Sequence, residues 1–452
     1  MRQMKLFSFL WNTGAHVAGW RHPASTELGQ HSLDFFREVA TIAERGKMDA
    51  IFLADSVGFH RTAGRDAFAR VDHVKLEPLT LLSALAACTS NIGLVATAST
   101  SFNHPYTLAR KFASLDHLSA GRAGWNIVTS TGENEAHNFG LDHNYGHADR
   151  YERAEEFVDV VTRLWDSWED EALVMDKASG RYSDPSRIHG LDHEGAFYKV
   201  KGPLNIARPP QGHPVMVQAG SSGVGRAFAA RHAEAIFTSH PGIDSARAFY
   251  ADVKRQVAEV GRDPEQVKIM ASVQPVVAAS EAEARRIADE LNALVHPDLG
   301  ISMLGAFLGG FDLSGHDPDG PLPDDIPETE NAKSTRERVM TLARENGLSI
   351  RQLADRIAAE RTSRSLIGTP EQIADGLVEW FDGGACDGFI IGAPYLPGGL
   401  EVFVDTVIPI LQARGLFRRE YEGATLRENL GLARPQNHFR LHPADHAEPE
   451  IW

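Results

Sequence analysis

The stretch RAGWNIVTSTGENEAHNFG, residues 122–140, runs an apolar segment directly into a series of polar side chains. Ile127 and Val128 are β-branched residues that favour a strand buried on both faces. Hydrogen-bonding side chains then follow within a dozen positions. Parallel α/β sheets bind ligands at the carboxyl ends of their strands, so this change from apolar to polar predicts a binding loop. Taken alone, the stretch fits a solvated loop without a ligand equally well.

The same transition recurs along the chain, between segments with a helical pattern. Apolar runs predict eight strands, at residues 5–11, 50–55, 92–100, 122–130, 214–220, 235–240, 267–277 and 388–393. Helical patterns separate them, as where Phe157, Val161 and Leu164 fall on one face. Eight such units in series predict an α/β protein with a closed (β/α)8 TIM barrel.

A doubly wound open sheet is the alternative topology. Such a fold would normally carry a dinucleotide-binding fingerprint after its first strand. Here that turn reads WNTGAHVAGW, residues 11–20, and lacks the required glycine spacing. We therefore favour the barrel.

We predict a single barrel domain over residues 1–452, with two insertions and a C-terminal extension from about residue 415. The first insertion, about 169–212, has no sustained period. The second, about 296–361, opens as a loop and then turns helical; long segments near a barrel mouth often act as lids, and we expect that role here. Its SIRQLADRIAAE segment, residues 349–360, lacks a basic recognition helix, so we interpret it as a packed surface helix and not as a DNA-binding motif.

The composition excludes several functional classes. The 452 residues carry a formal net charge of −16, which disfavours nucleic acids and anionic membranes as partners. No segment reaches about 18 uncharged apolar residues, the length that a membrane span needs. Cys88 and Cys386 are the only cysteines, too few for a disulfide framework or a thiolate metal cluster. We therefore expect a soluble cytoplasmic protein.

Two histidine pairs have the i,i+4 spacing of metal ligands. His143 and His147 form one pair, and His189 and His193 form the other. Neither pair lies in an HExxH motif, and both contain a glycine that interrupts a helix. We expect no metal.

Polar residues follow several of the predicted strands and would meet at the barrel mouth. Asp55 ends the second strand and Thr100 follows the third, while Asn126 and Ser130 lie at the end of the fourth. The sequence therefore predicts a ligand site at this end of the barrel.

An anion site is predicted beside it. The segment QAGSSGVGR, residues 218–226, places Ser221 and Ser222 among glycines where a helix should begin, an arrangement that can cradle a phosphate. His147 and Tyr151 lie four residues apart at the start of another helix and could point at the same anion. The plain alternatives are a tight strand-to-helix turn, a packed tyrosine and a capping histidine.

These segments resemble a known family. FLADS, TASTSFNHPYTLARKFASLDHLSAGRAGWNIVTS, NFG, HADRYERAEEF, QAGSSGVGR and LIGTPEQIADGL occur in order and cover most of the predicted barrel. In these motifs the chain is similar to the flavin-dependent monooxygenases of the bacterial luciferase-like superfamily. The similarity is to the branch of nitrilotriacetate monooxygenase component A, dibenzothiophene sulfone monooxygenase and long-chain alkane monooxygenase.

The resemblance implies a barrel that receives reduced FMN from a separate NAD(P)H-dependent flavin reductase. The flavin would react with O2 and form a 4a-hydroperoxide that oxygenates a small organic substrate. By resemblance, Asp55, Thr100, Asn126 and Ser130 would border the ring and ribityl chain of FMN, and His147, Tyr151, Ser221 and Ser222 would hold its phosphate. The family also suggests a homodimer or homotetramer.

Substrate-facing residues follow from position alone. His16 is the candidate proton donor because imidazole exchanges protons near neutrality, and a structural loop histidine is the alternative. Trp20, Phe59 and His137 are further candidates for the pocket. The sequence leaves open a flavin-binding protein without oxygenase turnover, an oxygenase that acts on flavin or another heterocycle, and a barrel that uses a deazaflavin.

Overall fold

Eight parallel strands close into a barrel in the computed structural model, which describes residues 2–26, 29, 31–59, 65–220, 222–327, 333–360, 364–442 and 445. The strands are β1 (Lys5–Leu10), β2 (Ala50–Leu53), β3 (Gly93–Ser99), β4 (Ala123–Val128), β9 (Val215–Gln218), β10 (Ala235–Thr238), β11 (Lys268–Val277) and β13 (Gly388–Ile391). β1 pairs with both β2 and β13, and β10 pairs with β11, so the circle is complete. The predicted (β/α)8 TIM barrel is confirmed.

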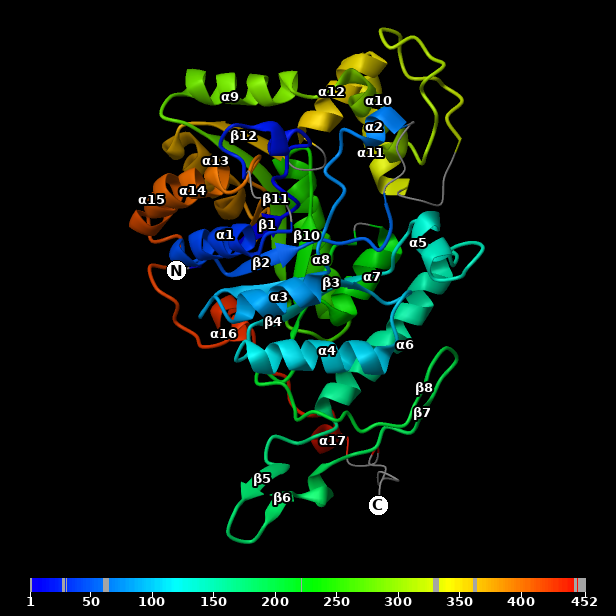
Figure 1. The fold of residues 1–452 in the computed structure, drawn as a ribbon, viewed down its shortest axis with the longest axis vertical. Helices are drawn as coiled ribbons and strands as arrows, with labels where there is room; N and C mark the ends of the chain where they lie inside the picture. Colours follow the sequence, from blue (N-terminus) through cyan, green and yellow to red (C-terminus); the bar gives the residue numbers. More distant parts are fainter. Residues whose placement is uncertain are drawn as a thin grey trace.

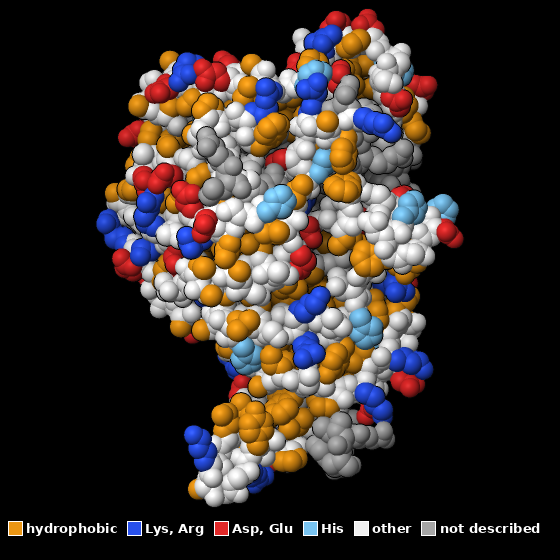
Figure 2. Space-filling model, in the orientation of Figure 1, with side chains coloured by type: hydrophobic (Ala, Val, Ile, Leu, Met, Phe, Trp, Pro, Cys, Tyr) orange, Lys and Arg blue, Asp and Glu red, His pale blue; other side chains and the backbone are white. Residues whose placement is uncertain are grey.

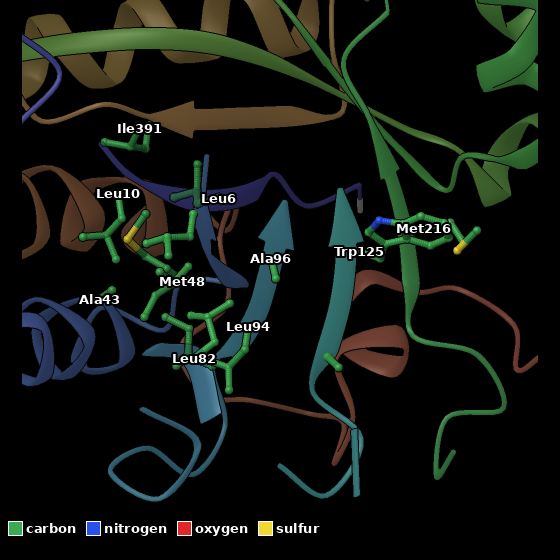
Figure 3. Packing of buried hydrophobic residues seen from close by; sticks show 14 of the residues in the cluster. Leu6, Leu10, Ala43, Met48, Leu82, Leu94, Ala96, Trp125, Met216 and Ile391 are labelled. Carbon is green, nitrogen blue, oxygen red and sulfur yellow. The ribbon is translucent and has the colours of Figure 1, made fainter. Parts of the chain in front are cut away.

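Helices surround the barrel, as Figure 1 shows. They are α1 (Leu33–Arg45), α3 (Pro78–Ala86), α4 (Pro105–Leu118), α6 (His147–Asp166), α7 (Gly223–His232), α8 (Ile243–Glu259), α9 (Glu281–Ala293), α13 (Pro370–Asp382), α14 (Gly398–Val402) and α15 (Ile408–Ala413). Alternate strand residues face them: Leu94 of β3 lies against Leu82 of α3 (Figure 3). The residues between, such as Val95 and Phe7, fill the barrel interior.

The C-terminal segment fills the amino-terminal end of the barrel. Leu426 and Leu430 of α16 (Leu426–Leu430) join the interior cluster. A side chain on Gly93 would lie 2.5 Å from Leu426, so glycine leaves the space that this leucine occupies. Between them, buried Arg427 binds Glu234 through two contacts of 2.5 and 2.9 Å. Ligands must therefore enter at the opposite end, where the strands finish.

The first insertion follows α6, and its Tyr198 Oη donates to the carbonyl of Thr100, after β3, at 3.4 Å. It contains the antiparallel pair β5 (Leu173–Asp176) and β6 (Arg181–Ser183), the short helix η2 (Pro185–Arg187) and the pair β7 (His193–Glu194) and β8 (Lys199–Val200). Figure 1 shows the β5–β6 hairpin projecting from one end of the molecule, together with α17 (His438–Leu441).

The second insertion forms α10 (Pro297–Phe307), α11 (Lys333–Asn346) and α12 (Ile350–Glu360), with an apolar core of its own around Leu304 and Leu353. The expectation that it opens as a loop is wrong, because His296 caps the Asp298 amide and Pro297 stands at the first helical position, which starts α10 at once. A further strand, β12 (Arg364–Gly368), pairs with the outer half of β11 and was not predicted.

Candidate functional site

The predicted ring-binding residues lie on neighbouring strands at the barrel mouth. Asn126 on β4 pairs with Thr97 on β3 and with Val217 on β9. Thr100 is fully buried, and its amide donates to the Val128 carbonyl at 2.9 Å. Ser130 adopts a left-handed φ of 48°, where its carbonyl accepts a hydrogen bond from the Asn144 amide group at 3.1 Å. Adjacent strand ends thus bring these residues to one side of the mouth.

The side-chain oxygen of Asn126 is a hydrogen-bond acceptor that has no donor among the described residues. Its Nδ2 donates to Thr97 Oγ1 at 2.9 Å, and Thr97 Oγ1 in turn donates to the Leu53 carbonyl at 2.8 Å. This chain fixes the orientation of the amide and leaves Asn126 Oδ1 buried without a hydrogen-bond partner among the described residues. Buried acceptors are nearly always satisfied, so such an atom marks a place where a ligand or water donates.

The second cluster joins α6 to the start of α7. Ser222 caps α7 by accepting from the Gly225 amide at 3.1 Å, and the hydroxyl of Tyr151 is hydrogen-bonded to Ser222. The rings of His147 and Tyr151 lie 5.2 Å apart. Burial raises the pKa of Tyr151, which keeps its hydroxyl protonated at neutral pH. The structure therefore brings His147, Tyr151 and Ser222 together; Ser221 lies outside the described residues.

Gly225 is what allows this approach. A Cβ at this position would lie 2.9 Å from Tyr151 Oη and 3.0 Å from Ser222 Oγ. The two hydroxyls and the first amides of a ten-residue helix consequently share one small space. Hydroxyls and helix amide groups bind a phosphate well without net positive charge.

Asp55 is a carboxyl group in a poorly solvated position at the end of β2. Burial raises its pKa to about 6, against the opposing charge of Lys75. Lys75 itself lies over the ring of Trp11, with 4.1 Å between its ammonium and the ring centroid. Perturbed carboxyl groups at a barrel mouth are frequent in functional sites.

Sequence reasoning missed Glu135, which ties two mouth loops together. Its carboxylate accepts from the Val57 amide at 3.2 Å and from the Gly132 amide at 3.0 Å. It thus joins the loop after β2 to the loop after β4. The sequence signal for this contact is a glutamate, Glu135, at the third position of α5 (Glu133–Asn138), where its carboxylate can accept the amide of the N-cap residue Gly132.

The contacts of the His16 ring are structural. Its Nδ1 accepts from the Ala18 amide at 3.1 Å, so Nε2 carries the proton and donates to Asn292 Oδ1 at 3.2 Å. The side chain is buried. These contacts favour the alternative stated above, a loop histidine that holds structure; a part in proton transfer stays a prediction.

The other substrate candidates are largely exposed. Trp20 is 45% exposed and Phe59 is 60% exposed, and the Phe59 ring packs edge-on against Phe68 at 5.5 Å. His137 is exposed and its Nε2 contacts the Asp142 carbonyl at 3.1 Å. Nothing in these contacts singles out one of the three for substrate.

The second insertion packs on the rim of the mouth. Leu299 of α10 and Ala358 of α12 form a cluster with Val17, which follows β1. Buried Gln274 of β11 donates to the Ala359 carbonyl at 3.3 Å. Burial lowers the pKa of His240, which follows β10, to about 4, and the charge of Arg338 on α11 adds to the effect. The insertion therefore reaches the rim from β1 to β11.

Within the described ranges, no group of three or more His, Cys, Asp or Glu residues is placed to hold a metal ion. The histidines with metal-like spacing have other partners: His189 Nε2 lies 3.1 Å from Glu169, and His193 Nε2 lies 2.9 Å from Glu156. In the same part of the chain, no helix is long and apolar enough to cross a bilayer.

Comparisons with known proteins agree with the fold. The luciferase-like monooxygenase family matches residues 7–386. N-acetyl-S-(2-succino)cysteine monooxygenase of Bacillus subtilis (strain 168) is 50% identical over 439 residues, which cover 97% of this chain and 98% of that protein. Nitrilotriacetate monooxygenase component A of Aminobacter aminovorans is 48% identical over 443 residues, covering 96% and 98%. A solved structure of riboflavin lyase, 34% identical, superposes with a TM-score of 0.88 over 99% of each chain.

The resemblance predicted from the motifs is confirmed by these matches, which extend over almost the whole chain. The chain belongs to the luciferase-like monooxygenase family and is a flavin-dependent monooxygenase.

Proposed function

We propose that this chain is the oxygenase component of a two-component system, that it binds FMN reduced by a separate flavin reductase, and that it oxygenates a small organic substrate with O2. The observation that carries the proposal is the meeting of Tyr151 and Ser222 at the start of α7, beside a glycine whose missing side chain lets both hydroxyls approach the helix. A dinucleotide-binding fingerprint is missing after the first strand of the sequence, which favours a reductase as a second protein.

The residues present fit the flavin. Tyr151, Ser222 and His147 would hold the phosphate, and the unpaired Asn126 Oδ1 would accept a hydrogen bond from an N–H of the ring. Asp55, Thr100 and Ser130 would border the ring and the ribityl chain. Reduced FMN, when bound, supplies the reaction with O2 and the transfer of one oxygen atom.

The protein's own contribution is to bind, orient and exclude water. The second insertion would cover the mouth, since its helices already pack on the loop after β1 and bond to β11. A dry site protects the reactive flavin from wasteful decay to peroxide. His16 would hold the end of α9, the helix that precedes the insertion, through Asn292.

The relatives guide the choice of substrate. Two proteins close to half identical to this chain are named for N-acetyl-S-(2-succino)cysteine and nitrilotriacetate, so these compounds are the first to assay. Riboflavin is the second candidate, because the riboflavin lyase structure superposes over the full chain.

The experiment supplies FMN, O2 and each candidate substrate, with NADH and a flavin reductase or with photoreduced FMN. We expect oxygenated product in both arrangements and none with NADH and this chain alone. Rapid NADH oxidation by the chain without a reductase would overturn the two-component assignment. Flavin binding without any oxygenated product from these compounds or from riboflavin would favour a binding protein.

A further inference from the structure

Gln274 of β11 carries a second buried acceptor that lacks a donor. Its side chain is 3% exposed, and Nε2 donates to the Ala359 carbonyl at 3.3 Å, near the end of α12. That bond fixes which end of the amide faces α12. The other end, Oε1, is buried without a hydrogen-bond partner in the described ranges. Buried acceptors are nearly always satisfied, so we expect a donor from outside the chain at this atom.

The strand register directs Gln274 into the barrel mouth. β11 pairs with β13 and then with β12 in a continuous register, so its side chains alternate between the two faces of the sheet. Met270 lies in the interior cluster, whereas Ala271 and Val273 pack with the surrounding helices. Gln274 is on the same face as Met270 and follows the last pair between β11 and β10, at Ala271. It therefore faces inward, at the level of the mouth.

Gln274 and the residues proposed for the flavin ring stand on opposite sides of this mouth. In the closed barrel, β4, β9 and β10 lie between β3 and β11 on one side, and β2, β1 and β13 lie between them on the other. Thr100 follows β3, and Asn126 belongs to the neighbouring β4. The β11 side is thus away from the proposed ring site, and a second ligand would find a polar partner there.

The second insertion encloses the β11 side of the mouth. Ala358 packs with Val17 and Leu299, next to the carbonyl that Gln274 holds. This contact is apolar, whereas the outer surface of the insertion, at upper right in Figure 2, carries charged side chains of both signs. A ligand that reaches Gln274 is therefore shielded from water. In such a place a site that is built to accept a hydrogen bond discriminates strongly against ligands without the donor.

We propose that Gln274 is a specificity-determining residue, and that its Oε1 accepts a hydrogen bond from an N–H or O–H group of the substrate. The substrate class is then a small polar molecule with such a donor, and not a hydrocarbon or a simple thioether. The inference rests on the proposed function, because it assigns a contact to the substrate of that reaction. Gln274 holds and orients this substrate, and it takes no part in the transfer of oxygen.

The test compares one pair of compounds in matched proteins. N-acetyl-S-(2-succino)cysteine carries an amide N–H, and its N-methyl analogue lacks that donor. Binding of each compound to the FMN-loaded chain is measured by titration calorimetry, and kcat/KM is measured with NADH, FMN, O2 and a flavin reductase. The proteins are the unmodified chain, Gln274→Met and the control Val17→Ala. The control loosens the apolar contact with the insertion and keeps the amide of Gln274.

We expect the unmodified chain to prefer the N–H compound, and Gln274→Met to lose about tenfold of that preference in both Kd and kcat/KM. A preference that arises from the size of the methyl group remains in both proteins. Val17→Ala should keep the whole preference, even where it binds both compounds less tightly. An equal preference in Gln274→Met and in the unmodified chain would overturn the inference.

A crystal structure with whichever compound is oxygenated provides the direct check. We expect an N–H or O–H group of that compound within hydrogen-bond distance of Gln274 Oε1. A water molecule in that place, with the compound elsewhere, would overturn the inference for any substrate.

Dimethyl sulfide and hexane, which have no N–H or O–H group, separate this inference from the proposed function. Oxygenation of either one, with none of the donor-bearing compounds named above, would overturn the inference and leave the oxygenase function standing. No oxygenated product from any of these compounds, with reduced FMN and O2 supplied, would count against the proposed function itself, and the inference would fall with it.

Discussion

Replacement of Gly225 by alanine tests the phosphate site through one methyl group. The methyl carbon would lie 2.9 Å from Tyr151 Oη, 3.0 Å from Ser222 Oγ and 3.1 Å from the Gly220 Cα. These separations are too short for a carbon atom, so at least one hydroxyl must move away. Gly225 occupies the third position of α7, where its amide is held by Ser222.

The effects on stability and on binding differ in size. Alanine favours a helix over glycine by about 1 kcal/mol, and disturbance of the Ser222 cap costs about as much, so the free energy of unfolding should hardly change. A hydrogen bond to a charged group contributes about 1.5–3 kcal/mol. Loss of one hydroxyl from the phosphate therefore raises the Kd for FMN about 30-fold, and loss of both raises it several hundred-fold.

The assay compares FMN with riboflavin, which lacks the phosphate. Binding of both flavins, oxidised and reduced under anaerobic conditions, is followed by fluorescence in the unmodified protein and in Gly225→Ala. The loss should be confined to FMN. Gly223→Ala is the control in the same helical turn, because a Cβ there meets no described atom within 4 Å. An equal loss for riboflavin, or an unchanged affinity for FMN, would show that the phosphate lies elsewhere.

Four further changes probe other parts of the molecule. Folding raises the pKa of Asp55 from 3.8 to about 6, so the folded state loses stability as the pH rises between those values. Asp55→Asn should therefore raise Tm at pH 8 and not at pH 4. An equal gain in Tm at both pH values would contradict this. Asn126→Leu should change the unfolding free energy of the flavin-free protein by no more than about 1 kcal/mol while weakening flavin binding about tenfold, measured by denaturant titration and fluorescence. Arg427→Met should destabilise the protein by about 3–5 kcal/mol because it leaves the largely buried Glu234 without its arginine. Adding Glu234→Met should restore most of the loss in a double-mutant cycle. Gln274→Met removes the hydrogen bond to the Ala359 carbonyl, so it should increase the peroxide released per reduced flavin consumed by up to about tenfold. Unchanged coupling of flavin oxidation to product formation would argue against a covering role for the insertion.

The barrel could be predicted from the sequence because each strand is a short apolar run that must be buried on both faces. All eight predicted runs contain a barrel strand, and the mouth residues followed from their position after these runs. The strand β12 was missed since its residues, Arg364–Gly368, are only partly buried and pair with the outer half of β11 beyond the barrel. A strand of that kind has no apolar pattern to reveal it.

Contacts between distant segments were the part that the sequence could not supply. Nothing in the local pattern around His16 shows that Asn292 lies 3.2 Å away. The sequence therefore suggests proton transfer by His16 from the chemistry of imidazole alone. In the fold, both ring nitrogens of His16 form structural hydrogen bonds. The same holds for Leu426, whose place inside the barrel depends on the absence of a side chain at Gly93.

The proposed flavin cradle and its proposed cover depend on different bonds, and this separation has a functional consequence. Tyr151, Ser222 and Gly225 hold one another on α6 and α7 through bonds that involve no described residue of the second insertion. The insertion is held to the barrel by Val17, which packs against Leu299 near its start, and by the hydrogen bond from Gln274 to Ala359 at its end. Loss of a tether of the insertion should therefore spare flavin affinity and lower the yield of oxygenated product. Loss of the cradle should lower both.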